Sequence, residues 1–291
     1  MEQLIGRFDR LLDLVGNYLH PVPVVPDWSA SIAFRWRHEA AFFGIEAIAQ
    51  PHLIRLSDIQ GLERHKAIID RNTGQFLAGR PANNVLLTGA RGSGKSSLVK
   101  AVLERYHADG LRLIEVDRAE LADLPIILDL LRGRPEKFIL FLDDLSFDDG
   151  DTAYKSLKVA LDGSMRSAGE NVLIYATSNR RHLMPEYFYE NSGGNGELHP
   201  GEAVDDKLSL SERFGIWLSF YPMSEDEYLA VAMHWLEHFQ GARLPRRELA
   251  KVAMEWSADR GARNGRVAYQ FARDYAGRTE PGVVKPGKAK R

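Results

Sequence analysis

A glycine-rich stretch between an apolar run and a helical pattern constrains this chain more than any other feature. Residues 89–97 read GARGSGKSS, which is a glycine, four further residues and then Gly-Lys-Ser. They follow the apolar run NVLLT, which is typical of a short buried strand, and lead into residues 96–107, whose apolar positions have a helical period. This order of strand, glycine turn and helix is that of a phosphate-binding loop, the P-loop.

The chemistry of such a loop follows from its backbone. Consecutive N–H groups in a glycine-rich turn point at one phosphate chain, and the helix that follows adds the positive end of its dipole. Lys95 can reach the β- and γ-phosphates, and the Ser96 hydroxyl can coordinate Mg²⁺. We therefore expect a nucleoside triphosphate to contact the loop residues Gly89, Ala90, Arg91, Gly92, Ser93, Gly94, Lys95, Ser96 and Ser97.

Composition sets wider bounds. The chain has 291 residues, enough for one large or two modest domains. Its formal net charge of −2 does not indicate binding to nucleic acid or to membranes. The absence of cysteine excludes disulfides and thiolate metal sites and fits a reducing compartment. Acidic residues interrupt the apolar N-terminus, and no apolar run approaches the ~18 residues of a membrane span. A cytoplasmic protein is expected.

Apolar runs alternate with helical patterns along the middle of the chain. Helical periods cover residues 119–132 and 151–168. Strands that are apolar throughout are typical of parallel sheets covered on both faces. The pattern predicts an α/β fold, a doubly wound five-stranded parallel sheet of the P-loop NTPase type within residues 55–222. Its strands are expected at residues 85–88, 111–116, 137–145, 171–179 and 215–222.

The two ends of the chain have helical and low-complexity patterns. Residues 1–54 are predicted to form an N-terminal helical segment, and residues 223–277 a small α-helical lid. The tail 278–291 is basic and rich in proline and glycine, and we expect it to be disordered. The predicted N-terminal helices cover residues 3–19 and 29–50, and the lid helices cover 224–240, 245–258 and 263–276.

Polar side chains follow the predicted strands on one edge of the sheet. The buried run FILFLDD ends in two adjacent acids, of which Asp143 is placed to hold Mg²⁺ through water and Asp144 to orient an attacking water. Asn179 ends the next strand on the same edge, where ligands of open α/β sheets gather. The sequence therefore predicts a hydrolytic centre beside the P-loop.

Three arginines complete the candidate site. Arg213 directly precedes the fifth strand, and a guanidinium suits the charge that develops on a transferring phosphoryl group. Arg263 and Arg266 open the last helical pattern three residues apart, so they share one helical face. Either of them could contact a bound nucleotide.

The order of the P-loop, FLDD, ATSN, SERFG and GARNGR, followed by a helical lid, resembles an AAA+ ATPase over residues 55–275. The whole-chain pattern resembles an uncharacterised bacterial AAA+ family of predicted ATPases. The resemblance implies ATP and Mg²⁺ as ligands, hydrolysis of ATP, and a homo-oligomer, a ring or partial ring, that acts on an unidentified protein or nucleic acid. The resemblance also implies roles for single residues. Lys95 and Ser96 would belong to the Walker A motif, Asp143 and Asp144 to Walker B, and Asn179 would be sensor 1. Arg213 would be an arginine finger acting in a neighbouring subunit, Arg263 or Arg266 would be sensor 2, and Ile59 and Gly61 would line the adenine pocket.

Asp144 departs from the AAA+ pattern, because most of the superfamily has glutamate there. The Asp144 carboxylate is one methylene closer to the backbone than that of glutamate, which argues against fast hydrolysis but not against Mg²⁺ binding. Replication initiators and helicase loaders also tend to carry Asp-Asp, and initiators a similar Arg-Phe-Gly. A long polar loop at residues 180–207 separates Asn179 from Arg213, either as a partner-binding element or as an inert insertion.

Several alternatives remain open at the level of sequence. A P-loop kinase would need no finger from a neighbour, an initiator- or loader-like ATPase would respond to DNA, and a nucleotide-gated switch would hydrolyse ATP slowly. His234 and His238 could share a helical face as metal ligands, although no third ligand is evident.

Overall fold

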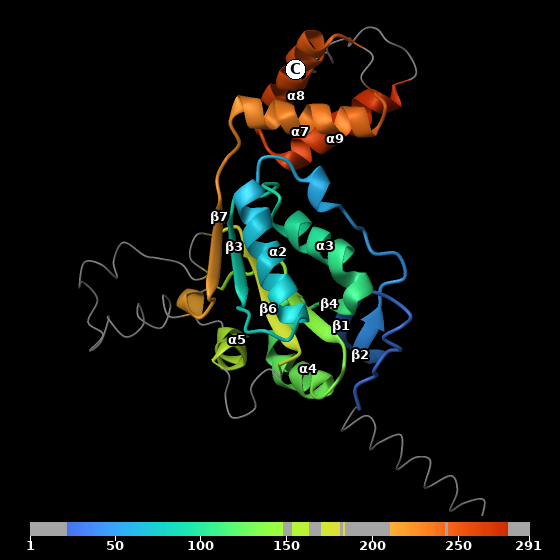
Figure 1. Cartoon of the computed structure of the whole chain (residues 1–291), viewed down its shortest axis with the longest axis vertical. Coiled ribbons are helices and arrows are strands. Elements are labelled where there is room, and N and C mark those ends of the chain that lie inside the picture. The colour runs from blue at the N-terminus through green and yellow to red at the C-terminus, as the bar shows by residue number, and fades with distance from the viewer. Residues whose placement is uncertain are drawn as a thin grey trace, which may run out of the picture.

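One mixed sheet organises the chain in the computed structural model, which describes residues 22–147, 153–162, 170–180, 183, 210–241 and 244–278. The sheet has seven strands in the order β2-β1-β4-β5-β6-β3-β7 (Figure 1). Their bounds are β1 Ala33–Glu39, β2 Phe42–Ala47, β3 Val85–Gly89, β4 Leu111–Glu115, β5 Lys137–Leu142, β6 Val172–Ser178 and β7 Ile216–Phe220.

The five strands predicted from apolar runs are parallel neighbours. β4 pairs with β5, β5 with β6, and β3 lies between β6 and β7. β6 is buried along its whole length, as a parallel strand covered on both faces must be. The predicted α/β fold with a parallel P-loop sheet is confirmed, and all five carboxyl ends lie at one edge of it.

The helical prediction for residues 29–50 is wrong, because this segment forms β1 and β2. Phe34 and Trp36 are fully buried while Arg35 between them is exposed, so the burial alternates with the period of a strand. β1 pairs antiparallel with β2 and parallel with β4, which adds two strands to the five predicted. The predicted helix over residues 3–19 and nearly all of the predicted tail and 180–207 loop lie outside the described residues.

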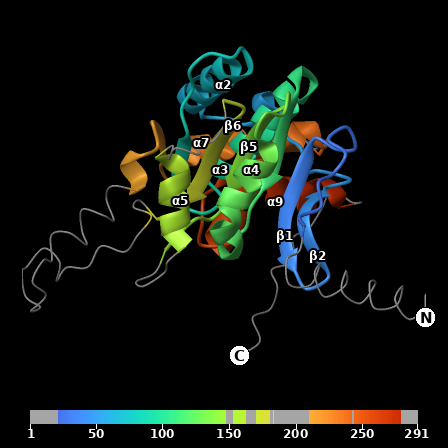
Figure 2. The same ribbon diagram turned by 90° about the horizontal axis from the view of Figure 1, so that it is seen from below.

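Helices cover both faces of the sheet, and each face has its own hydrophobic core. α2 and α3 cover one face, with Ile69 and Leu98 in its core, and α4 and α5 cover the other, with Leu124 and Leu157 (Figures 1 and 2). Short 3-10 helices precede or follow several of them. The bounds are η1 Leu56–Asp58, α2 Glu63–Leu77, α3 Lys95–Tyr106, η2 His107–Asp109, η3 Arg118–Asp123, α4 Leu124–Leu131 and α5 Ala153–Leu161.

Three C-terminal helices form a separate helical bundle with its own core, as predicted from their periodicity. They are α7 Glu225–His238, α8 Arg246–Asp259 and α9 Gly265–Gly277, and they lie above the carboxyl edge of the sheet (Figure 1). The Ser224 hydroxyl accepts the N–H of Glu227 to cap α7, and the Asn264 side chain accepts the N–H of Val267 to cap α9. Both caps fix where the helices begin.

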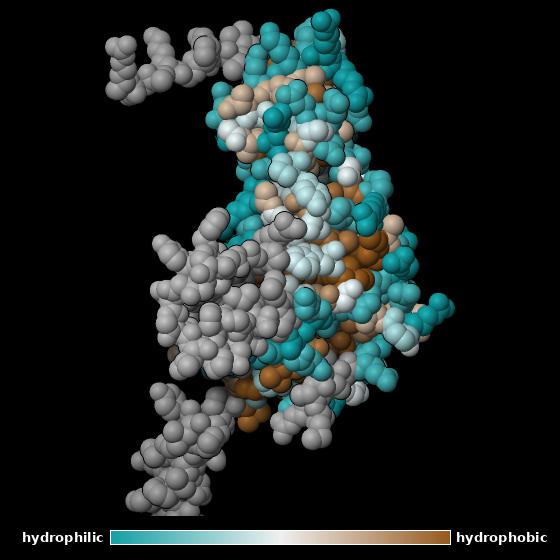
Figure 3. Space-filling view, turned by 90° about the vertical axis from the view of Figure 1, so that its left-hand side faces the viewer, coloured by the Kyte–Doolittle hydropathy of each residue, from teal (hydrophilic) through white to brown (hydrophobic). Residues whose placement is uncertain are grey.

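β7 is an end strand of the sheet and carries exposed aromatic residues. Trp217 is 37% exposed and Tyr221, just past the strand, is 79% exposed. Viewed from this side, the molecule shows hydrophobic residues gathered below the helical bundle (Figure 3). Within the described residues, no helix combines the length and apolar character needed to cross a bilayer.

Candidate nucleotide-binding site

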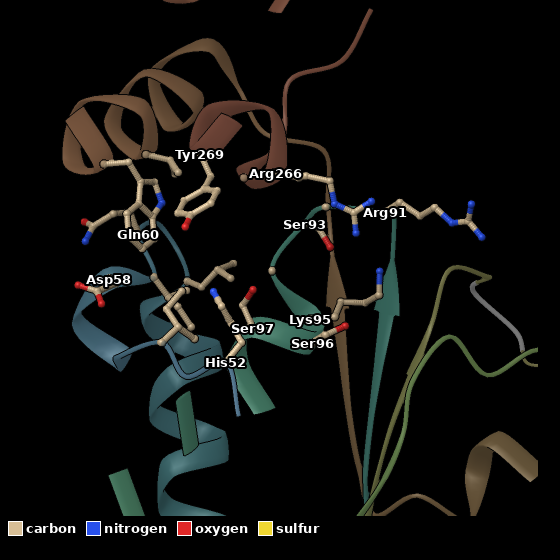
Figure 4. Close-up of a pocket in the computed structure, with 18 of the residues that line it drawn as sticks. His52, Asp58, Gln60, Arg91, Ser93, Lys95, Ser96, Ser97, Arg266 and Tyr269 are labelled. Carbon is tan, nitrogen blue, oxygen red and sulfur yellow. The ribbon is translucent and has the colours of Figure 1, made fainter. Parts of the chain in front are cut away.

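A pocket of about 960 Å³ lies between the carboxyl edge of the sheet and the helical bundle (Figure 4). The P-loop forms one end of it, together with the acids that follow β5 and with Asn179 after β6. The segment around η1 and side chains from α7 and α9 form the rest. The topology thus brings most of the predicted site residues into one cavity.

The P-loop has the backbone of a phosphate cradle. Gly92 and Gly94 adopt φ of 77° and 102°, in the left-handed region that glycine enters without strain. The Ser93 hydroxyl is buried without a hydrogen-bond partner among the described residues. α3 begins directly after Gly94, so its free N–H groups face the pocket. These features fit a bound phosphate chain.

Lys95 is only 6% exposed and lies at the base of the P-loop. Its Nζ donates to the carbonyls of Gly89 at 2.6 Å and Ala90 at 2.9 Å, and to Oδ1 of Asn179 at 3.1 Å. Burial lowers the pKa of the Lys95 ammonium, while the charges of the two acids after β5 oppose that shift. A phosphate anion would restore the environment that favours the charged form.

Asp143 and Ser96 lie together as a candidate Mg²⁺ site. The Ser96 hydroxyl donates to Oδ1 of Asp143 at 2.7 Å. The hydroxyl of Thr177 in β6 donates to the same oxygen at 2.6 Å. A carboxylate and a hydroxyl beside a phosphate cradle form the oxygen donor set that Mg²⁺ prefers. Thr177 was missed in the sequence, although it lies two residues before Asn179 in ATSN.

Asp144 is held from three sides. Its φ is 56°, and its N–H donates to the Thr177 hydroxyl at 2.9 Å. The Asn179 amide donates to Oδ1 of Asp144, and Arg91 contacts Oδ2 at 3.1 Å. The predicted grouping of Asp144 with Asn179 is therefore present, and Arg91 joins it from the P-loop.

The arginines of the last helix have different surroundings. Arg266 lines the pocket at the start of α9. Arg263 precedes that helix, pairs with Glu225 at 2.6 Å and does not line the pocket. The structure thus favours Arg266 over Arg263 as the arginine that faces a nucleotide.

Arg213 lies away from the pocket of its own chain. It precedes the amino end of β7 and contacts Asp162 after α5, whereas the pocket lies at the carboxyl ends of the strands. A strand of five residues spans about 17 Å. Arg213 is therefore separated from the P-loop by about the length of one strand, because the two lie at opposite ends of the strands.

The part of the pocket remote from the P-loop combines apolar and aromatic side chains with polar ones. Ile59 lines it as predicted, but Gly61 does not. The bundle contributes Trp235 and Tyr269, whose rings meet edge to face at 4.8 Å. The sequence analysis missed Trp235 and Tyr269 because aromatic residues in a helical stripe are indistinguishable from core residues. It also missed His52 and Gln60, which lie outside the helices.

The structure brings His234 and His238 into no metal-ligating group among the residues that it describes. His234 lies 3.4 Å from Asp58, while His238 lines the pocket. No group of three or more metal-ligating side chains occurs in the part of the chain that the structure describes.

Comparison with known proteins places the chain in a family. A family model described as "Protein of unknown function (DUF815)" matches residues 29–279. The chain belongs to this family. A search of curated proteins finds no match for it. The predicted P-loop NTPase fold of this DUF815 chain is confirmed by its strand order and by the P-loop between β3 and α3.

The DUF815 chain is also similar to solved structures at low identity. The Thermotoga maritima RuvB Holliday junction branch migration motor has 15% identity and a TM-score of 0.43, over 76% of this chain and 71% of that one. The Aeropyrum pernix ORC2 protein in its ADPNP-ADP complexes has 12% identity and a TM-score of 0.43, over 77% and 70%. The Escherichia coli MS115-1 HORMA:CdnC:Trip13 complex has 15% identity and a TM-score of 0.40, over 76% and 90%.

Proposed function

We propose that this chain binds Mg-ATP and hydrolyses it as an AAA+ ATPase, driving or gating the remodelling of a macromolecular partner. One observation carries the proposal: Lys95, Asp143 and Asp144 converge with Ser96 and Asn179 at the P-loop end of one large pocket. A nucleotide-binding loop alone would not need acids and an amide gathered beside it.

Binding rests on the loop and on the oxygen pair beside it. The N–H groups of the P-loop and Lys95 would hold the phosphates, and the apolar part of the pocket around Ile59 would hold the base. Ser96 and Asp143 would hold Mg²⁺, which supplies positive charge against the β- and γ-phosphate oxygens when bound.

Hydrolysis rests on Asp144 and its neighbours. The Asp144 carboxylate would orient a water in line with the γ-phosphate and take up its proton, as a general base does. Asn179 would fix that carboxylate through Oδ1, while Lys95 would stabilise charge on the phosphoryl oxygens.

The position of Arg213 supports an oligomer. Arg213 lies at the opposite edge of the sheet from its own pocket, and its guanidinium would act on the nucleotide of a neighbouring copy. We propose a ring or partial ring in which each active site takes Arg213 from the next subunit, with a protein or nucleic acid as client.

A slowly hydrolysing switch is the second candidate, and the surroundings of Asp144 favour it. Both carboxylate oxygens already have partners, Asn179 on Oδ1 and Arg91 on Oδ2. A turnover number for purified protein separates the two: a switch binds ATP tightly but hydrolyses it on the scale of minutes.

Replacement of Lys95 by alanine tests the proposal directly. The cradle loses its buried cation, so binding of a fluorescent ATP analogue with Mg²⁺ should fall below detection. Lys251→Ala, at an exposed position of α8 outside the pocket, is the matched control and should bind like the parent. Unchanged binding by Lys95→Ala, with a native melting curve, would refute the P-loop as the site.

A further inference from the structure

Arg91 connects the P-loop to the acid that would activate water. It is one of the four residues between Gly89 and the Gly-Lys-Ser of the loop, and its Nη2 lies 3.1 Å from Oδ2 of Asp144. No hydrolytic step requires this pair. On the contrary, the contact occupies the carboxylate oxygen that Asn179 leaves open.

The partners of Asp144 differ in how easily they can leave. Thr177 lies in a buried strand and Asn179 directly follows it, so both are fixed by the sheet. The Arg91 side chain is 74% exposed and joins its partner through a single exposed ion pair. Exposed pairs of this kind are weak because water and salt screen them. Arg91 is therefore the partner that a competing anion displaces.

A bound nucleotide would supply that anion. Arg91, Arg266 and Lys95 lie at one end of the pocket (Figure 4), and the charges of both arginines bear on Lys95. A triphosphate concentrates several negative charges there, and a guanidinium forms charge-assisted hydrogen bonds with phosphate oxygens as it does with a carboxylate. The γ-phosphate would thus compete with Asp144 for the same side chain.

We propose that Arg91 is a positioning residue that exchanges Asp144 for the γ-phosphate when ATP binds. The inference rests on the proposed ATPase function. In the empty and ADP states, Arg91 holds Oδ2 of Asp144 and keeps water activation off. In the ATP state, the released carboxylate is free to orient water. The acid becomes competent only when there is a phosphate to transfer.

Affinity for two nucleotides tests the exchange without relying on turnover. Arg91→Ala should weaken binding of Mg-AMP-PNP, a non-hydrolysable ATP analogue, about tenfold, while ADP binding changes less than about twofold, because only the triphosphate reaches the guanidinium. Arg91→Lys keeps the positive charge but not the planar set of guanidinium donors, and it should recover part of the lost affinity for Mg-AMP-PNP. Arg80→Ala, an exposed arginine outside the pocket, is the control.

The other half of the exchange can be observed on the side chain itself. In NMR spectra of ¹⁵N-arginine-labelled protein, the guanidinium signal of Arg91 is identified as the one that disappears in Arg91→Ala. In the parent protein this signal should shift when AMP-PNP is added and should not shift when ADP is added. Asp144→Asn should shift the same signal in the absence of nucleotide. An equal loss of affinity for both nucleotides, or a signal indifferent to Asp144→Asn, overturns the exchange. Parent protein that binds neither nucleotide overturns the proposed function itself.

Discussion

The backbone N–H of Gly265, the first residue of α9, donates a hydrogen bond to the carbonyl of Gly92 in the P-loop at 2.9 Å. Asn264, which caps α9, packs its side chain against the same glycine. The helical bundle is thus joined to the loop that would hold phosphate. A nucleotide that moves the loop must therefore also move the bundle or break this contact.

Gly92→Ala tests that junction. An added Cβ would lie 2.7 Å from the Asn264 side chain, at a backbone φ of 77°, so the loop and α9 must separate. We expect nucleotide affinity to fall at least about tenfold, measured by equilibrium titration. Gly79→Ala is the matched control, because Gly79 has a φ of 69° but nothing within 4 Å of the added carbon. Equal losses in both variants would assign the effect to backbone strain alone.

Asp144→Asn separates binding from hydrolysis. The variant keeps the shape of the side chain but loses the charge that polarises water, so we expect ATP binding to persist and turnover to fall by about 10²–10⁴. Phosphate release and analogue binding are measured on the same preparation. Asp109→Asn, in the exposed η2 turn, serves as the control. Parent-like turnover in Asp144→Asn would transfer the water-positioning role to another acid.

The two arginines near the start of α9 should differ. Arg266 lines the pocket, whereas Arg263 pairs with Glu225 outside it. Arg266→Ala should lower ATP affinity or turnover about tenfold through loss of a charge-assisted contact with phosphate. Arg263→Ala should stay within about twofold of the parent, since exposed ion pairs contribute little. A larger loss in Arg263→Ala than in Arg266→Ala would show that Arg263 contacts the nucleotide.

Arg213→Ala should bind ATP normally and hydrolyse it slowly. Its guanidinium is remote from its own pocket, so only a neighbouring site loses a charge, and a missing finger costs about 10³–10⁵ in rate, or less where other charges remain. Turnover of the parent should rise more than linearly with protein concentration. Mixing Arg213→Ala with Lys95→Ala should restore activity, because some interfaces then combine an intact loop with an intact finger. Mixed oligomers that form yet stay inactive would contradict the arrangement in trans.

Local patterns in the sequence predicted which polar residues meet at the carboxyl end of the sheet. The P-loop, the acids after β5 and Asn179 each follow a continuous apolar strand, and parallel strands bring their carboxyl ends together. β1 was missed because its aromatic residues suggested a helical face, whereas the alternation of buried Phe34 and Trp36 with exposed Arg35 and half-buried Arg37 has a period of two. The contacts of Arg91 with Asp144 and of Arg263 with Glu225 depend on tertiary packing, which no local pattern encodes.

The β1–β2 hairpin also determines where this protein can be shortened. Phe34 and Trp36 lie in the same core as Leu124 and Leu140, and the Trp36 indole donates to the nearly buried Asp123 at 2.9 Å. A fragment beginning at residue 55 would uncover one edge of β4 and leave that carboxylate without its donor. We expect such a fragment to aggregate through the unpaired edge of β4, whereas one that starts before Trp28 keeps β4 paired with β1.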